Sequence, residues 1–360
     1  MIDLNLLPDG GMAWLDGSGP DSQMVLSTRV RLARNLVGYP FATRSTTDHR
    51  EAILKDVSDA ARETVSLREA IRFRVDQLDS EDRQLLHERH LVSKELAGLE
   101  GPHGVRAGAA VLVQNRLGLM LNEEDHLRMQ GMCSGFDLES AYQQVERLDS
   151  ELGQRLPFAF HPEFGYLTSC PTNVGTGLRA SVLIHLPGLV LTKEISKVLQ
   201  GLAQVGLTFR GLYGEGSEVV GNFFQLSNQT TLGKSEPELL DHLGKMVRQL
   251  MEYEAQARAV LQRDVPTIIE DKVWRAYGLL RHARTLSFEE TMNLLSGVRL
   301  GVGLGLVDRC GLYALNKLLV HTQPAHLAAL EGVRLDEDDL NVRRARYVRA
   351  VLEDDAGRRG

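Results

Sequence analysis

Arginines recur on the polar side of segments that the sequence predicts to be strands. In residues 25–34 (VLSTRVRLAR) polar and apolar residues alternate, and the polar face carries arginines. Guanidinium groups bind phosphate oxygens in forked pairs, so arginines on several strands indicate a site for a polyanion such as a nucleoside triphosphate. The bland alternative is a set of solvated arginines in an Arg-rich protein, since only 8 of the 41 basic residues are Lys. The arginines in question are Arg29, Arg31, Arg128, Arg179 and Arg210.

Carboxylates lie at two predicted loop ends, and a cysteine lies in a Pro/Gly-rich loop between them. Glu124 belongs to an acidic run, Glu215 and Glu218 share the second loop, and Cys170 precedes a proline. Such carboxylates could hold a cationic substrate beside an arginine-bound anion. The alternatives are a surface ion pair between Glu124 and Arg128, four residues apart, and an inert buried thiol.

Other classes of protein are excluded by the composition and by missing motifs. The formal net charge of −7 argues against a protein that binds nucleic acid through bulk positive charge. No apolar run approaches the ~20 residues of a membrane span, and the N-terminus lacks a signal-peptide pattern, so a cytoplasmic protein is expected. The sequence has no P-loop, no HExxH and no CxxC, so we expect no Walker-type site, no protein-bound metal and no disulfide framework.

These side chains must be positioned by a sheet in the first two thirds of the chain. In the first strand Leu26, Val30 and Leu32 are predicted to share the apolar face. Beyond about residue 260 strand signals disappear, which predicts an all-helical region. The predicted strands are 25–34, 110–114, 117–121, 207–213 and 222–229, with one more after a Pro/Gly loop within 168–189. The predicted helices of the first part are 47–65, 137–152 and 192–204, with one helix or a helix pair over 80–97, and a long one follows the capping box Ser235–Glu238.

Four segments resemble, in the right order, the signatures of the phosphagen kinase (ATP:guanido phosphotransferase) family. The last of them is most similar to a bacterial branch that phosphorylates arginine in proteins. The resemblance implies an α+β catalytic domain over residues 1–257, with an antiparallel sheet flanked by helices, and an all-helical dimerisation or regulatory domain over 258–360. The segments are STRVRLARN (27–35), NEEDHLRMQ (122–130), CPTNVGTGLRASV (170–182) and RGLYGEGSEVVGNFFQLSNQTTLGKSE (210–236).

The resemblance implies nucleotide contacts from five parts of the chain. The arginines match those that hold the ATP phosphates, and His90, in ERHLVS, matches a nucleotide-contacting histidine. Where the wider family has a further phosphate arginine, this chain has Tyr213, as the bacterial branch does. The residues implied to bind ATP, which would bring Mg²⁺ with it, are Ser27, Thr28, Arg29, Val30, Arg31, His90, Arg128, Arg179, Ala180, Ser181, Val182, Leu183, Arg210, Gly211, Leu212, Tyr213 and Gly214.

The resemblance also implies four catalytic residues. Glu124 matches the carboxylate that holds and deprotonates the guanidinium, and Cys170 matches a cysteine whose sulfur contacts it. Glu215 matches the second carboxylate of the protein-kinase branch, and Glu218 aligns with that of the free-arginine enzymes, so both stay candidates. The assignment is chemically sound, because a guanidinium with a pKa above ~12 becomes a nucleophile only after it loses a proton.

The implied activity is transfer of the ATP γ-phosphate to arginine side chains of proteins, either to mark them for Clp-type degradation or to regulate a stress response. Two alternatives stay open, a kinase of free arginine and a non-catalytic adaptor of a protease or repressor. The STRVR motif begins at Ser27, without the helical domain that precedes it in free-guanidino kinases, which favours the protein kinase. The implied partners are proteins with exposed arginines, a McsA-like activator, a Clp ATPase and a second copy of the chain in a homodimer; nucleic acid and membrane are not expected.

One motif of that branch is altered here. Its C-terminal domain usually carries RDxxRA, which recognises phosphoarginine, whereas this chain has Leu340-Asn341-Val342-Arg343-Arg344-Ala345. Leu340 cannot offer a guanidinium fork to the phosphate, and Asn341 offers a neutral oxygen in place of a carboxylate. Sensing of phosphoarginine by this region is therefore expected to be weak or absent.

This expectation is tested by calorimetry with free phosphoarginine on the segment from about residue 260 to 360. We expect no saturable heat at micromolar ligand, because two of the three charged groups of the motif are missing. Saturable micromolar binding that is lost in Arg344→Ala would show that the pocket persists in altered form.

Overall fold

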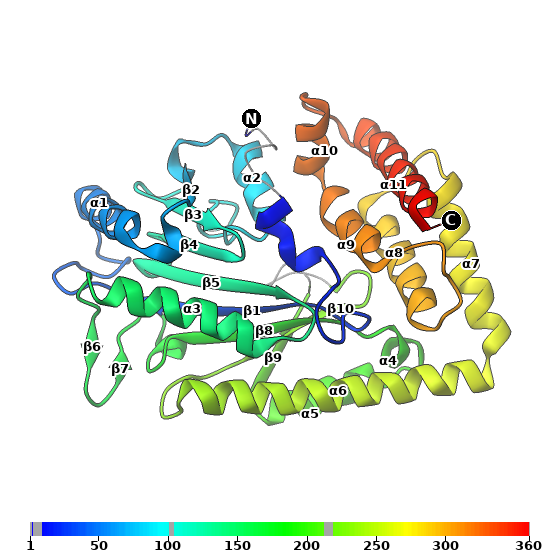
Figure 1. Cartoon of the computed structure of the whole chain (residues 1–360), viewed down its shortest axis with the longest axis horizontal. Coiled ribbons are helices and arrows are strands. Elements are labelled where there is room, and N and C mark those ends of the chain that lie inside the picture. The colour runs from blue at the N-terminus through cyan, green and yellow to red at the C-terminus, as the bar shows by residue number, and fades with distance from the viewer. Residues whose placement is uncertain (1, 3–8, 101–103, 212–218, 360) are drawn as a thin grey trace.

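The fold is an antiparallel sheet with helices on one face and a helical region against its other face (Figure 1). The computed structural model describes residues 2, 9–100, 104–211 and 219–359. Within them the main sheet has eight strands in the order β2-β3-β4-β5-β1-β8-β10-β9, each paired antiparallel to its neighbours. The strands are β1 Val25–Arg34, β2 Ile71–Arg74, β3 Ala110–Gln114, β4 Leu117–Leu121, β5 Leu127–Ser134, β8 Leu178–His185, β9 Leu207–Arg210 and β10 Phe223–Asn228, with a separate hairpin β6 Phe160–His161 and β7 Gly165–Tyr166.

Helices of the first part of the chain cover one face of this sheet. In Figure 1, α3 and α6 run along the underside of the strands. Gly131 in β5 allows α3 to approach closely, because an added Cβ would lie 2.7 Å from Val145 and 2.8 Å from the carbonyl oxygen of Ala141. The helices are α1 Thr47–Glu63, α2 Ser80–Glu88, α3 Leu138–Gly153, α4 Pro187–Leu191, α5 Ile195–Gln204, α6 Glu236–Asp264, α7 Pro266–His282, α8 Phe288–Gly303, α9 Leu312–His321, α10 Pro324–Glu331 and α11 Glu337–Arg359.

Strand β1 departs from simple alternation near its start. Val30 and Leu32 lie in the core beneath the sheet as predicted, but Leu26 packs in the second core cluster, on the opposite face. The register between β1 and β8 shifts between Val25 and Ser27. Because side chains alternate with a period of two, one extra residue moves Leu26 to the other face.

Two predicted helices are shorter than the sequence pattern suggests. Helix α2 ends at Glu88, because His90 takes a left-handed backbone with φ 58°. Thr192 does not begin a helix; it is the C-cap residue of α4, and the left-handed Lys193 (φ 63°) separates α4 from α5. The predicted start of α6 is confirmed, since Ser235 and Glu238 form the capping box.

Helices α7–α11 form a layer that shares a core with the upper face of the sheet. Leu26 and Phe223 from the strands pack in one apolar cluster with Val273, Leu295 and Leu318 from the helices. The 29-residue α6 runs without a break past residue 257, where a domain boundary was predicted, and ends at Asp264. None of the helices in the described ranges combines the length and apolar character that a membrane crossing requires.

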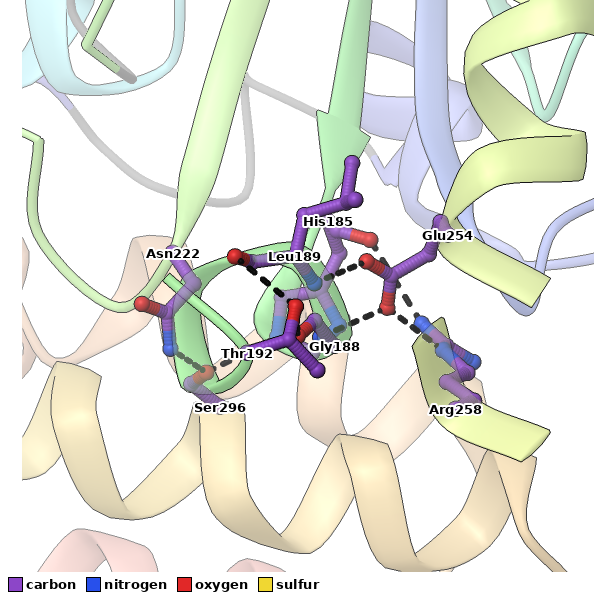
Figure 2. A network of polar contacts seen from close by, with 8 residues as sticks. All are labelled: His185, Gly188, Leu189, Thr192, Asn222, Glu254, Arg258 and Ser296. Carbon is purple, nitrogen blue, oxygen red and sulfur yellow. Dashed lines mark hydrogen bonds and ion pairs between the residues drawn. The ribbon is translucent and has the colours of Figure 1, made fainter. Parts of the chain in front are cut away.

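A buried polar network joins α6 to the strand ends and α4 (Figure 2). Glu254 accepts hydrogen bonds from the backbone N–H groups of Gly188 (2.9 Å) and Leu189 (3.0 Å) and from Arg258 Nε (2.6 Å). Its side chain is 0% exposed, and burial raises its pKa while Arg258 opposes that shift. The carboxylate thus satisfies two orphan N–H groups at the start of α4 and balances a buried guanidinium.

Glu254→Gln should destabilise the protein by about 3 kcal/mol, because it leaves the buried Arg258 without its counter-charge. Urea denaturation followed by circular dichroism measures the change. The matched control is Asp241→Asn, which breaks an exposed ion pair with Lys245, 2.7 Å long, and should cost less than about 0.5 kcal/mol. Equal effects of the two variants would contradict the role given to Glu254.

Candidate functional site

The predicted arginines come together because five strands are neighbours in the sheet. The order β5-β1-β8-β10-β9 places the arginines of β5, β1, β8 and β9 on one face of the sheet, with β10 between the last two strands. Arg31 in β1 is directly opposite Arg179 in β8. On the other side of β1, Arg128 in β5 is opposite Ala33. Arg210 in β9 is opposite Gln225 in β10, whose Oε1 accepts a hydrogen bond from Arg29 Nη2 at 3.3 Å. Residues distant in the sequence therefore form one cationic surface.

Two adjoining cavities open on this surface. The first has a volume of about 310 Å³ and is lined by His90, so we call it the His90 cavity. The second has a volume of about 150 Å³ and is lined by Cys170, so we call it the Cys170 cavity. Both are lined by the same four residues, which therefore stand between them: Arg31, Glu124, Arg128 and Arg210. A chain of phosphates lying along this shared wall would have its far end beside Cys170.

The guanidinium groups are held in an unfavourable electrostatic state. Burial, together with the charges of Arg128 and Arg179, lowers the pKa of Arg29 to about 10. The pKa of Arg31 falls well below its usual value for the same reasons, and Arg31 Nε is buried with no hydrogen-bond partner among the described residues. A polyanion at this surface would supply the missing counter-charge and acceptors.

Glu123 gives the cluster its built-in counter-charge. It is 3% exposed, pairs with Arg128 Nη1, and accepts a hydrogen bond from Ser93 Oγ at 2.6 Å. Burial alone would raise its pKa, but Arg128, Ser93 and the N–H of Glu124 outweigh burial and lower it. Glu123 therefore stays ionised and holds Arg128 in place.

The pKa of Glu124 is shifted in the opposite direction to that of Glu123, and this difference matters for proton transfer. Burial first, and then the charges of Glu123 and Asp125, raise its pKa, while Arg128 and a hydrogen bond with Cys170 oppose the shift. The Sγ atom of Cys170 lies 3.1 Å from Thr172 Oγ1. A carboxylate of raised pKa beside a thiol, at the end of the cationic surface, can hold a guanidinium and accept a proton from it.

The loop of Cys170 is tied to the loop of Glu124 through buried polar groups. Asp125 Oδ1 accepts hydrogen bonds from the backbone N–H of Ser169 and from Asn35 Nδ2, both at 2.6 Å. Asn35 also donates to the carbonyl oxygen of Leu167 at 3.1 Å. These bonds fix the thiol relative to the carboxylate although the two are far apart in the sequence.

Histidine 90 lies at the other end of the cationic surface. Its ring packs edge-on against Trp14, with 5.3 Å between ring centroids. Burial, followed by the charge of Arg29, keeps its pKa well below the usual value, so the imidazole is neutral. A neutral ring in this position can pack against a nucleoside.

The other predicted nucleotide contacts divide between the two faces of the sheet. Ser27, Ser181 and Leu183 border a small hollow beside His90. The side chains of Val30, Ala180 and Val182 lie on the opposite face, in the apolar core, and Thr28 is fully buried with its Oγ1 donating to the carbonyl oxygen of Gly135. The side chains of these four residues therefore point away from the cationic surface, because alternate residues of a strand face opposite sides. Gly211 follows β9, while Leu212, Tyr213, Gly214, Glu215 and Glu218 lie outside the described residues.

Several lining residues were missed from the sequence. Gln225 could have been found, since it alternates with the buried Phe224 and Leu226 in β10. Lys94 and Arg106 line the His90 cavity from segments without regular structure, where no periodicity marks the inward side.

The altered C-terminal motif has a structural role in α11. Arg344 is 2% exposed and donates to the carbonyl oxygens of Thr322 (2.8 Å) and Leu286 (2.9 Å) and to Asn341 Oδ1 (2.6 Å). Arg343 pairs at 3.0 Å with Glu331. Arg344 therefore holds the helices together, and a loss of binding in Arg344→Ala needs a stability measurement beside it.

Comparison with known proteins agrees with this geometry. Residues 52–257 match the ATP:guanido phosphotransferase C-terminal catalytic domain, and residues 266–359 match the protein-arginine kinase McsB C-terminal domain. The protein-arginine kinase of Brevibacillus brevis is 44% identical over 347 residues, 94% of this chain and 94% of the relative. That of Symbiobacterium thermophilum is 44% identical over 342 residues, 94% and 96% of the two chains.

Solved structures show the same fold over about two thirds of the chain. A duplicated taurocyamine kinase from Schistosoma mansoni, bound to transition-state analogue components, matches with a TM-score of 0.59 and 27% identity, covering 66% of this chain and 34% of that one. A lombricine kinase matches with a TM-score of 0.58 and 23% identity, covering 69% and 71%. With both parts of the chain matched and relatives aligned along nearly all of it, the chain belongs to the ATP:guanido phosphotransferases and, within them, to the protein-arginine kinase family.

Proposed function

We propose that this chain transfers the γ-phosphoryl group of ATP to the guanidinium of arginine side chains in proteins. The observation that carries the proposal is the shared wall of the two cavities, where Arg31, Arg128 and Arg210 lie beside Glu124. ATP in the His90 cavity would lay its phosphates along this wall, and a substrate arginine in the Cys170 cavity would face the terminal phosphate. Family membership supports the same reaction.

The chemistry needs positioning and charge neutralisation more than covalent catalysis. Glu124 and Cys170 orient the guanidinium, and Glu124 accepts the proton that one of its nitrogens loses. That nitrogen forms the N–P bond while the bond from the γ-phosphorus to the β–γ bridging oxygen breaks, and ADP leaves with the electron pair. The arginines of the cationic surface stabilise the charge on the phosphoryl oxygens. Mg²⁺ would arrive with ATP, bound mainly by phosphate and water oxygens.

The second carboxylate is assigned to Glu215 or Glu218, both outside the described residues. The resemblance of YGEG to the protein-kinase branch supports Glu215. Two carboxylates on one guanidinium would hold it by forked hydrogen bonds and keep the nucleophilic nitrogen in line with the phosphate.

We further propose a homodimer in the cytoplasm that works with a McsA-like activator and a Clp ATPase and marks proteins for degradation under stress. The match of residues 266–359 to the McsB C-terminal domain supports this setting. The dimer is also supported by Ile268 and Leu279, which are 65% and 48% exposed and lie about three turns apart on one side of α7.

Incubation with ATP and casein, and separately with free arginine, tests the substrate class by mass spectrometry of acid-labile phosphoarginine. We expect modification of casein and none of free arginine. Glu124→Ala and Cys170→Ser should lower the casein rate by about a hundredfold or more while far-ultraviolet circular dichroism stays unchanged. Transfer to free arginine alone would indicate a small-molecule kinase, and transfer to neither would indicate an adaptor.

Arg179→Lys should raise the KM for ATP about tenfold although the charge is kept, because an ammonium cannot make the forked contact with phosphate oxygens. Steady-state kinetics with casein measure the change. The control is Arg62→Lys, since Arg62 is 64% exposed in a surface pair with Asp59 and should leave the kinetics unchanged. An unchanged KM in Arg179→Lys would remove this residue from the phosphate site.

A further inference from the structure

A buried carboxylate at the end of α2 holds the first turn of α10, in the helical C-terminal region. Glu88 is 0% exposed. Its Oε1 accepts the backbone N–H of Ala325 and its Oε2 that of His326, both at 3.0 Å. Glu88 also accepts from Gln84 Nε2 at 3.2 Å. Because the first N–H groups of a helix have no partner within it, Glu88 takes the place of a capping side chain for α10 across the interface.

The side chain of His326 completes the contact, and the geometry determines its protonation. Its Nδ1 lies 3.2 Å from Glu88 Oε2, and its Nε2 lies 3.0 Å from Arg89 Nε. Arginine can only donate, so Nε2 is an acceptor and the proton is on Nδ1, which donates to Glu88. The ring also stacks on His321, with 5.0 Å between centroids. His326 thus bridges two consecutive residues of the catalytic part.

These two residues lead directly into the turn that carries His90. Glu88 is the last residue of α2, Arg89 is its C-cap, and His90 follows with φ 58°. A left-handed backbone is unfavourable for a residue with a side chain and persists only where the surroundings enforce it. On the sheet side, Gln130 Nε2 donates to the His90 carbonyl oxygen at 2.9 Å. On the other side, the support comes from α10 through Glu88 and Arg89.

We propose that Glu88 and His326 are positioning residues for the ATP site: the N-terminus of α10 holds the end of α2 so that His90 keeps its place in the His90 cavity. The proposal rests on the proposed function, in which that cavity takes the nucleotide. The helical region is then a structural component of the ATP site, although none of the residues of α7–α11 lines the described walls of the His90 cavity.

Another contact joins the helical C-terminal region to the sheet without leading to either cavity. Ser296 Oγ in α8 lies 2.8 Å from both His185 Nε2 and Asn222 Nδ2 (Figure 2). None of these three residues lines the His90 or the Cys170 cavity. Loss of this contact should loosen the interface without moving His90, which makes Ser296→Ala the matched control.

The test compares full-length His326→Ala, His326→Asn, Glu88→Gln and Ser296→Ala. For each, thermal unfolding gives the stability, calorimetry with a non-hydrolysable ATP analogue gives the affinity, and casein phosphorylation gives KM and kcat. We expect His326→Ala and Glu88→Gln to weaken analogue affinity and raise the KM for ATP about tenfold, the effect of losing a charge-assisted hydrogen bond. Ser296→Ala should lower the melting temperature and leave both ATP values within about twofold.

His326→Asn separates positioning from packing. An asparagine amide can donate to Glu88 from about the place of Nδ1, so this variant should recover most of the ATP affinity although it loses the ring stack on His321. It also keeps the proposal testable if Glu88→Gln does not fold. ATP affinity that stays at the wild-type value in folded His326→Ala, or that falls equally in Ser296→Ala, overturns the proposal. A wild-type protein that binds the analogue but phosphorylates nothing overturns the proposed function instead.

Discussion

The structure depends on holding several guanidinium groups on one face of a sheet against their mutual repulsion. Arg29 and Arg31 are half-buried beside Arg128 and Arg179, and desolvation together with these charges lowers the pKa values of the first two. Glu123 balances the charge of Arg128. The apolar face of the same strands offsets this unfavourable arrangement, because the side chains beneath pack on α3 and α6 and leave the strands no freedom to separate. The arginines are therefore already in place when a polyphosphate binds.

The upper face of the sheet is divided between this charged surface and the helical region. Near the start of β1 the shift in register moves Leu26 to the upper face, where it joins Phe223 and the helices α7–α9 in a second core. Polar contacts flank that core, among them the network around Glu254 in Figure 2 and the bonds of Glu88 to α10. The helical region is therefore packed onto the catalytic sheet as part of one structure, close to the residues that precede His90.

The acceptor end of the site is organised by hydrogen bonds between loops. Asp125 holds the Ser169 backbone and Asn35, which places Cys170 beside Glu124. Glu123 and Glu124 are adjacent in the sequence, but their pKa values shift in opposite directions. Glu123 is held by Arg128 and Ser93, which lower its pKa, whereas desolvation and the like charges of Glu123 and Asp125 raise the pKa of Glu124. The lowered pKa suits Glu123 to an ion pair with Arg128, and the raised pKa suits Glu124 to proton transfer.

The sequence by itself determined the α+β class, the strand faces of Arg29, Arg31 and Arg179, the start of α6 at Ser235 and the family, because alternation, capping and short motifs are local properties of the chain. Tertiary structure decided the side of Leu26, the end of α2 at Glu88, the roles of Gln225 and Asp125, and the burial of Arg344. Each of these depends on a register, a left-handed turn or a partner far along the chain. A shift in pKa, the face on which a side chain lies and a hydrogen bond to a distant residue arise only when packing brings the residues together.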